Sequence, residues 1–501
     1  MRPKSNSNFN LTIYFIFLLL SSAILLFSSI DSPLHTSFRH VDSAWFFMEG
    51  KAWMEGMIPY LDFADSKGPF LFLFYGIAYL ISPTNYWGVY MLHCIYFSFV
   101  FYVAYLVGHN CLFASRNSNQ RILLSFCGAA LLGLFYFTYR HNEMRCEDIC
   151  QLQLLYLIYS LCCHMLSVPK TRSITYGLLD GVAIGSALLI KWNIGIAFMA
   201  IPIANWIIVL IRRENLVKVV SGFFLGLFII LIPFIMYFLS KGCLHMFVNE
   251  YILHTGQTFS NSDTGLINAY LNELRLALTS SSFLGFVAMF VPIWFFRHLD
   301  WRLKYLPTCC GLFMFFFLTI GKGGLGYYHQ AEDGWFVFST CILAIVIQRL
   351  VKRSFITIAI SILLVLSFNI AWAFRYHRNL IYGSEAHSFT IVDNKLRQLK
   401  YPLILHWDYF ETGIGIGSRA LPACRYWAMQ TGGEEFCRPM QIDAVLRRIP
   451  DIITVQSMSP ASIASDKAEI LHRLGYQYVG SIKDWFGCYG NIYVKQELSI
   501  L

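Results

Sequence analysis

Long apolar runs alternate with short polar segments along most of the chain. The first run is Leu11–Ile30, and ten more lie at about 86–107, 122–139, 148–166, 174–191, 193–211, 217–239, 282–296, 305–320, 334–348 and 354–374. A helix needs roughly 20 mostly apolar residues to cross a bilayer. The pattern predicts an all-α, multi-pass membrane domain of eleven spans, in which the first run is an uncleaved helix rather than a signal peptide.

One further apolar run, Phe70–Ile81, is too short to span and follows Pro69, a residue that suits the first turn of a helix. We expect a surface or re-entrant helix there. With it left out of the count, the basic clusters of the loops all fall on one side, as the positive-inside rule requires. The amino terminus is then cytoplasmic, and the outer segments are 31–85, 140–147, 240–281, 321–333 and 375–501.

From about Tyr376 the composition shifts toward charged and turn residues. YPLILHW, DIITVQ, YQYVGSI and NIYVKQ have the pattern of strands, and IDAVLRRIP and DKAEILHRLG that of short helices. We therefore expect a membrane domain over residues 1–375 and a small extracytoplasmic α/β domain over residues 376–501. Cys424, Cys437 and Cys488 could form one disulfide there in an oxidising compartment.

Composition narrows the class of function. The chain is 56% hydrophobic and 13% charged, and its formal charge of +9 comes from clusters in loops between apolar runs. That placement argues against nucleic-acid binding. Most of the 14 cysteines lie in apolar runs without CxxC pairs, so no zinc site is indicated.

The outer segment 31–85 has helix signals of its own. Asp42 precedes a helical stretch over Ser43–Glu55, and Gly56 suits its carboxyl end. The first reading of Asp42 is therefore a helix N-cap. Its place at the outer interface, beside tryptophan and phenylalanine, leaves a functional role open.

A second group of acids lies on the same predicted face, in RHNEMRCED at the start of the fourth span. It is either a self-compensated polar turn or a second half of a site. In the latter case Glu147 or Asp148 would face Asp42 across a cavity, with Arg145 beside them. Such a group could supply a base, a metal ligand and positive charge for a phosphate.

Three basic positions are also candidates. Lys191, at the outer end of a helix, either snorkels to the headgroups or binds a lipid phosphate. Lys67 is ambiguous in the same way, although Lys-Gly-Pro makes a sharp turn. The loop Gly321–Gly334, which contains His329, is rich in donors but lacks the strand–loop–helix context of a phosphate-binding glycine loop.

Together these motifs resemble the GT-C superfamily of polytopic glycosyltransferases, which includes protein O-mannosyltransferases and the aminoarabinose transferase of lipid A. The similarity is to a bacterial branch whose first outer loop has Asp, a helix, Gly-x-x-Pro-Tyr-x-Asp and Lys-Gly-Pro. The matching residues here are Asp42, Gly56, Pro59, Tyr60, Asp62, Lys67, Gly68 and Pro69, with Glu147–Asp148 and Lys191-x-Asn193 further on. The late loop departs from the pattern, because His329 is followed by Gln330 and then by two acids.

The resemblance implies a polyprenyl-phosphate-linked sugar as donor, a glycan, lipid or protein as acceptor, and inversion at the anomeric carbon. The site would face the outside of the cytoplasmic membrane, where the lipid donor resides. Asp42 would be the general base, and Glu147 and Asp148 would position the acceptor.

The remaining candidates serve the departing phosphate. Lys67, Lys191, Arg145 and His329 would bind it. If a divalent metal such as Mg or Mn takes part, Asp42 and Glu147 would be its ligands.

Two other classes remain as alternatives. A polysaccharide polymerase or ligase is also polytopic, but we would expect it to use Arg and His sites. A carrier of lipid-linked sugars would show ionisable groups near the bilayer midplane and repeated halves. The acids here gather at the outer interface instead.

Overall fold

The structure is a computed structural model. It describes residues 7–29, 31–34, 41–139, 143–166, 173–254, 266–279, 287–299, 303–319, 326–351, 354–382, 396–409, 413–429, 434–457, 466–483 and 488–498.

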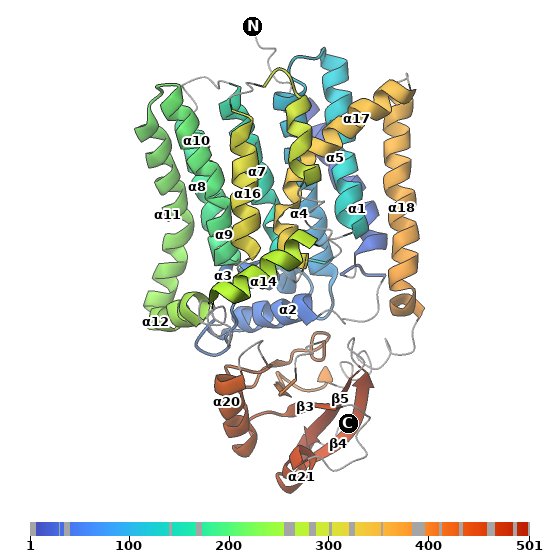
Figure 1. The fold of residues 1–501 in the computed structure, drawn as a ribbon. Coiled ribbons are helices and arrows are strands. Elements are labelled where there is room, and N and C mark those ends of the chain that lie inside the picture. Colours follow the sequence, from blue (N-terminus) through green and yellow to red (C-terminus); the bar gives the residue numbers. More distant parts are fainter. Residues whose placement is uncertain are drawn as a thin grey trace. The chain divides into compact units, whose positions relative to one another are not determined.

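The described part of the chain is mainly helical (Figure 1). Six stretches are long and apolar enough to cross a membrane: Leu11–Ser28, Trp87–Leu112, Ser118–Phe137, Trp192–Ile211, Leu216–Ser240 and His329–Val351. Shorter apolar helices cover Pro69–Ile81, Ile174–Ile190, Tyr305–Thr319 and Ile356–Ala371. The chain is therefore a multi-pass membrane protein, while the total of eleven spans stays a prediction.

The chain divides into two compact units. The first comprises residues 1–29, 93–237 and 259–373, and the second comprises residues 30–92, 238–258 and 374–501. Each is described separately below.

The first unit is a bundle of helices (Figure 1). Its elements are α1 (Ser7–Ser28), most of α4 (Trp87–Leu106), α5 (Ser118–Tyr139), α6 (Cys146–Ile149), α7 (Gln151–Met165), α8 (Ser173–Ile190), α9 (Trp192–Phe198), α10 (Ala200–Ile211), most of α11 (Leu216–Ser240), α14 (Leu266–Thr279), α16 (Tyr305–Thr319), α17 (Val337–Val351) and most of α18 (Ser354–Tyr382). Three shorter pieces belong to it: a π-helical turn after α4, Val107–Leu112, and the 3-10 helices η4, Val291–Phe295, and η5, Gly326–Phe336. Within the bundle α7 packs against α8, α10 and η5, and α5 against α17.

Glycines let α8 and α11 approach closely in this unit. A Cβ at Gly181 would lie 2.0 Å from the backbone oxygen of Phe223, and one at Gly226 would lie 1.9 Å from that of Leu178. Small residues are the usual means by which membrane helices bring their backbones together, because lipid supplies no hydrophobic drive between them. No larger side chain fits at this contact without moving a helix.

The predicted span at 282–296 is wrong in its described part, residues 287–296. Residues 287–290 form one helical turn, and the 3-10 helix η4 follows at Val291–Phe295. Pro292 lies at the start of η4, where it has no amide hydrogen to donate. Apolar character alone predicted a continuous helix that the chain does not form here.

In the second unit, α2 (Val41–Met54) packs against α3 (Pro69–Ile81). The helix predicted after Pro69 is confirmed, with the proline in its first turn. The contact again depends on glycine: a Cβ at Gly50 would lie 2.4 Å from the backbone nitrogen of Gly76. The two helices therefore touch backbone to backbone.

The carboxyl-terminal part of the second unit contains a five-stranded mixed sheet of order β2-β1-β3-β5-β4. Its elements are β1 (Leu403–Trp407), β2 (Leu421–Pro422), α20 (Glu434–Leu446), β3 (Ile452–Ser457), α21 (Asp466–Arg473), β4 (Tyr476–Lys483) and β5 (Tyr489–Lys495). β1 is parallel to β2 and β3, whereas β5 is antiparallel to β3 and β4. The four predicted strands and both predicted helices are present, and only β2 was not predicted.

The remaining described elements of the second unit are short. They are α12 (Leu244–Phe247), the π-helical η3 (Val248–His254) and the 3-10 helix η6 (Gln496–Leu498).

Candidate active site

Helix α2 carries the first candidate, Asp42. The helix already begins at Val41, so Asp42 lies in its first turn. The predicted N-cap role is therefore wrong, because the helix starts earlier than the sequence signals indicated. The half-buried carboxylate lies at the positive end of the helix dipole.

Seven residues further along α2 lies Glu49, on the same face as Asp42, since seven residues make nearly two turns. Its side chain is fully buried. Oε1 accepts a hydrogen bond of 2.8 Å from Trp45 Nε1. Burial, together with the nearby charge of Asp65, raises the pKa of Glu49 well above its ordinary value.

The loop after α2 explains why the glycine, proline and tyrosine of the motif stand where they do. Gly56 has φ +99°, a conformation that ends α2 and that side chains rarely adopt. Asp62 accepts a 2.7 Å hydrogen bond from the amide of Ile58, which closes the turn around Pro59. Tyr60 also has positive φ, and its hydroxyl donates to the backbone oxygen of Lys67 at 2.6 Å.

The ring of Tyr60 holds this loop in place. It is fully buried and packs against Phe72 of α3 and against Phe238, Phe247 and Tyr251. Aromatic rings at such separations add packing energy beyond burial alone. The backbone of Lys67 is thus anchored to a rigid aromatic cluster.

The side chain of Lys67 lies beside Asp65. Lys67 Nζ is 3.9 Å from Asp65 Oδ1 and donates to Ser66 Oγ at 3.0 Å. Asp65 Oδ1 also accepts from the Ser66 amide at 2.5 Å. The lysine side chain keeps 25% of its surface exposed, whereas that of Asp65 keeps 8%. The ammonium group of Lys67 therefore lies near the surface of this unit, beside the buried carboxylate of Asp65.

In the first unit, Glu147 and Lys191 form a buried ion pair. Lys191 lies at the break between α8 and α9 and donates from Nζ to Glu147 Oε1 at 2.6 Å. The two side chains keep 10% and 3% of their surface exposed. The snorkelling alternative for Lys191 is wrong, because its ammonium is held inside the protein.

Asp148 and Arg145 both serve the start of α6. Asp148 Oδ2 accepts a 2.9 Å hydrogen bond from the amide of Arg145, as in a capping box. The guanidinium of Arg145 pairs with the buried carboxylate of Glu143. Residues 140–142 of the predicted acidic cluster lie outside the described residues.

Gln151 ties this region to the late loop. Its amide nitrogen donates to the backbone oxygens of Glu147 at 3.0 Å and of Gln330 at 2.8 Å. Tyr136 donates to its other end at 2.8 Å. The acids of α6 and the helix η5 are therefore fixed to one another.

His329 lies in η5 and is buried. It stacks on Phe315 with ring centroids 4.7 Å apart, and its Nδ1 is 3.7 Å from Glu332 Oε2. The predicted glycine loop before it, residues 321–325, lies outside the described residues.

The candidates are therefore distributed over both units. Glu147 and Lys191 are in direct contact, and Arg145 and Asp148 share the same short helix start. Asp42 and Lys67 belong to the second unit. That Glu147 or Asp148 faces Asp42 stays a prediction.

Metal ligation finds no support in the described residues, which contain no group of three or more His, Cys, Asp or Glu side chains placed to hold an ion. Of the two predicted ligands, Glu147 has one oxygen engaged by Lys191.

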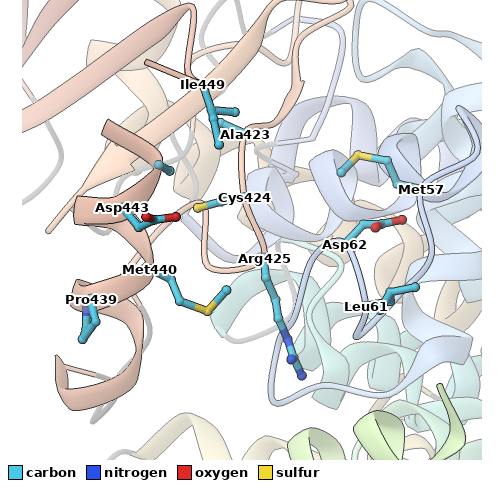
Figure 2. Close-up of a pocket in the computed structure, with 11 residues that line it drawn as sticks. Met57, Leu61, Asp62, Ala423, Cys424, Arg425, Pro439, Met440, Asp443 and Ile449 are labelled. Carbon is cyan, nitrogen blue, oxygen red and sulfur yellow. The ribbon is translucent and has the colours of Figure 1, made fainter. Parts of the chain in front are cut away.

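A separate cavity of about 600 Å³ lies within the second unit (Figure 2). Its lining comes from the loop after α2 and from the carboxyl-terminal segments: Met57, Leu61, Asp62, Ala423, Cys424, Arg425, Pro439, Met440, Asp443, Ala444 and Ile449. Arg425 is held by an ion pair of 2.7 Å with Glu250. Most of the lining residues are apolar, and Asp62, Arg425 and Asp443 are the charged ones.

The sequence analysis assigned no role to Glu49, Asp65 or Gln151. The helical spacing of Asp42, Trp45 and Glu49 was a usable signal for a shared helix face. The contact of Gln151 with Gln330 joins residues that are far apart in the chain, so the local sequence around either residue could not predict it.

No family model and no curated protein sequence matches the chain. The chain nevertheless shares its fold with solved structures. The chain is similar to the crystal structure of ArnT from Cupriavidus metallidurans bound to undecaprenyl phosphate, with 12% identity, 98% of both chains covered and a TM-score of 0.63. The apo state of ArnT matches over the same share with 12% identity and a TM-score of 0.55.

A third similar structure is that of the Archaeoglobus fulgidus oligosaccharyltransferase in complex with Zn and sulfate. It is 13% identical and covers 95% of this chain and 72% of its own, with a TM-score of 0.44. At that score it adds nothing to the argument.

Proposed function

We propose that this protein is an inverting glycosyltransferase of the cytoplasmic membrane. It transfers a sugar from a polyprenyl-phosphate-linked donor to a glycan, lipid or protein acceptor on the outer face. The observation that carries this is the first outer loop, where a first-turn carboxylate and a partly exposed lysine lie in one unit of a chain with the ArnT fold.

Asp42 is the general base in this proposal. It takes the proton of the acceptor hydroxyl as that oxygen attacks the anomeric carbon, and the bond from this carbon to the phosphate oxygen breaks. The sugar joins the acceptor with inversion, and polyprenyl phosphate leaves. A half-buried carboxylate in the first turn of a helix suits this role, because the packed helix fixes its position.

Lys67 binds the donor phosphate. Two features support this: the lysine side chain is partly exposed, and its backbone is anchored through Tyr60. The structure of ArnT with bound undecaprenyl phosphate supports a donor of this chemical class. Lys191, Arg145 and His329 stay candidates for the same phosphate, although each lies beside a carboxylate.

Glu147 and Asp148 position the acceptor. Both residues lie in α6, and Gln151 links this helix to η5. These hydrogen bonds give the two side chains the rigidity that positioning an acceptor requires. No step of the proposal depends on a metal. Residues 376–501 form an extracytoplasmic domain, and the amino terminus is cytoplasmic.

The test is Asp42→Asn, which keeps the side-chain size and removes the base. Purified variant and wild type would be compared for transfer of sugar from a polyprenyl-phosphate donor. We expect a loss of at least about 100-fold in rate, the usual contribution of general-base catalysis.

Asp466→Asn is the matched control, because Asp466 also lies in the first turn of a helix, α21. It should leave the rate unchanged. Wild-type transfer by Asp42→Asn would exclude Asp42 as the base.

A further inference from the structure

Gln151, the first residue of α7, is a fully buried amide that bonds to three other elements. Its Nε2 carries two hydrogens and donates to the backbone oxygens of Glu147 in α6, at 3.0 Å, and of Gln330 in η5, at 2.8 Å. Its Oε1 accepts a 2.8 Å hydrogen bond from the hydroxyl of Tyr136 in α5. Both ends of the amide therefore have partners, and Tyr136 fixes which way round the amide lies.

The chemistry of this position requires a glutamine. An ionised glutamate of nearly the same size has no hydrogen to donate to the two carbonyl oxygens, and asparagine is one methylene shorter. The bond to Gln330 joins residues 179 positions apart, so it holds η5 in register with the start of α7. The bond to Glu147 holds α6 in the same frame.

The residue before Gln330 is His329, whose buried ring is held on one side only. The ring stacks on Phe315 with centroids 4.7 Å apart, and Nδ1 lies 3.7 Å from Glu332 Oε2. Nε2 is buried and has no hydrogen-bond partner among the described residues. Buried polar atoms nearly always have a partner, so this nitrogen indicates a ligand. In a protonated ring both nitrogens donate, and Nε2 then suits a phosphate oxygen.

We propose that Gln151 is a positioning residue that holds His329 where Nε2 donates to the phosphate of the lipid-linked donor. The amide acts on two points at once, the backbone next to His329 and the backbone of Glu147. It thereby fixes the phosphate contact relative to the acid that positions the acceptor. This inference rests on the proposed function, in which the donor is a polyprenyl phosphate.

The experiment measures binding of undecaprenyl phosphate to the full-length protein in detergent micelles, by calorimetry. His329→Phe keeps a ring against Phe315 and removes both nitrogens. It should weaken binding about tenfold, which corresponds to one hydrogen bond to a charged group. Gln151→Met keeps the length of the side chain and removes the amide. It should weaken binding about fivefold, because His329 is then displaced from its productive position.

The double variant separates positioning from a general structural effect. If Gln151 acts through His329, the protein with both substitutions should bind no more weakly than His329→Phe alone. Losses that multiply, to about 50-fold, would refute the inference. Wild-type binding by either single variant would refute it as well.

Gln153→Met is the matched control. Gln153 is a buried amide on the same helix, and it bonds to Tyr96 of α4 and Ser186 of α8. Its substitution removes the same chemical group without removing a bond to η5, so binding should stay at the wild-type level. A loss equal to that of Gln151→Met would contradict the inference, because any missing amide of α7 would then have the same effect.

Tyr136→Phe keeps the inference testable if Gln151→Met does not fold. It leaves both donor bonds of Gln151 possible and removes the hydroxyl that fixes the amide. Binding should weaken about threefold, and His329→Phe should abolish this difference. Wild-type binding by Tyr136→Phe would count against the inference. A negative result with any of these variants leaves the proposed function standing, whereas a wild type that binds no undecaprenyl phosphate would overturn both.

Discussion

The ion pair of Glu147 and Lys191 allows a prediction that separates stability from donor binding. At 2.6 Å and an effective dielectric constant of about 20, the two charges attract by about 6 kcal/mol. Burying two ions costs several kcal/mol each, so the net contribution of the pair is small. Removal of one partner is different, because it leaves a buried charge uncompensated.

We therefore expect Lys191→Met or Glu147→Gln alone to destabilise the protein by about 3–5 kcal/mol. The double variant, in which neither charge remains, should lose about 2–3 kcal/mol less than the sum of the two. The assay is unfolding of the purified protein in mixed micelles of increasing SDS content, followed by tryptophan fluorescence. Strict additivity would refute the view that each charge mainly compensates the other.

The same variants test the role of Lys191 toward the donor. If Lys191 serves to neutralise Glu147, the double variant should bind undecaprenyl phosphate with nearly wild-type affinity. A double variant that recovers stability but binds more than tenfold more weakly would assign the phosphate contact to Lys191 and contradict this reasoning.

Two further predictions concern other parts of the chain. Alkaline phosphatase fused after Tyr376 should be active, as the distribution of basic loops requires, and an active cytoplasmic reporter there would overturn the orientation. Burial lowers the pKa of His406 to about 3, against about 6.5 for an unfolded chain. Stability from this neutral histidine is complete above pH 6.5 and falls by about 1.4 kcal/mol per unit as the pH drops toward 3. His406→Asn should flatten this dependence in thermal unfolding of the full-length protein, and a curve parallel to the wild type would exclude His406 as its source.

Local signals predicted much of the fold. Proline before an apolar run located α3, and alternating strands flanked by turn residues located the sheet. β2 was not predicted, because it has only two residues and is a strand only through its pairing with β1. The start of α2 was misplaced by the strong capping preference of Asp42, which is a statistical signal that neighbouring contacts can override.

The candidate site was predictable in its residue types and less so in its contacts. The Lys-Gly-Pro turn and the acids of α6 could be chosen from the sequence. Their partners could not, because the bond from Lys191 to Glu147 joins positions 44 residues apart and depends on tertiary packing. The local sequence does not distinguish a buried lysine from a lysine whose side chain reaches the lipid headgroups.

The contact between Gly50 and Gly76 has a consequence for how this loop can fail. The backbones of α2 and α3 meet there without any intervening side chain. The distance between the two helices therefore depends on both residues being glycine. A methyl group at position 50 would lift the helix off its seat and carry Asp42 and Glu49 with it. Both carboxyl groups would still be present, but they would be displaced from their positions in the wild-type protein. The activity of a variant in this segment therefore depends on whether Gly50 and Gly76 are kept, as well as on whether the acidic and basic residues are present.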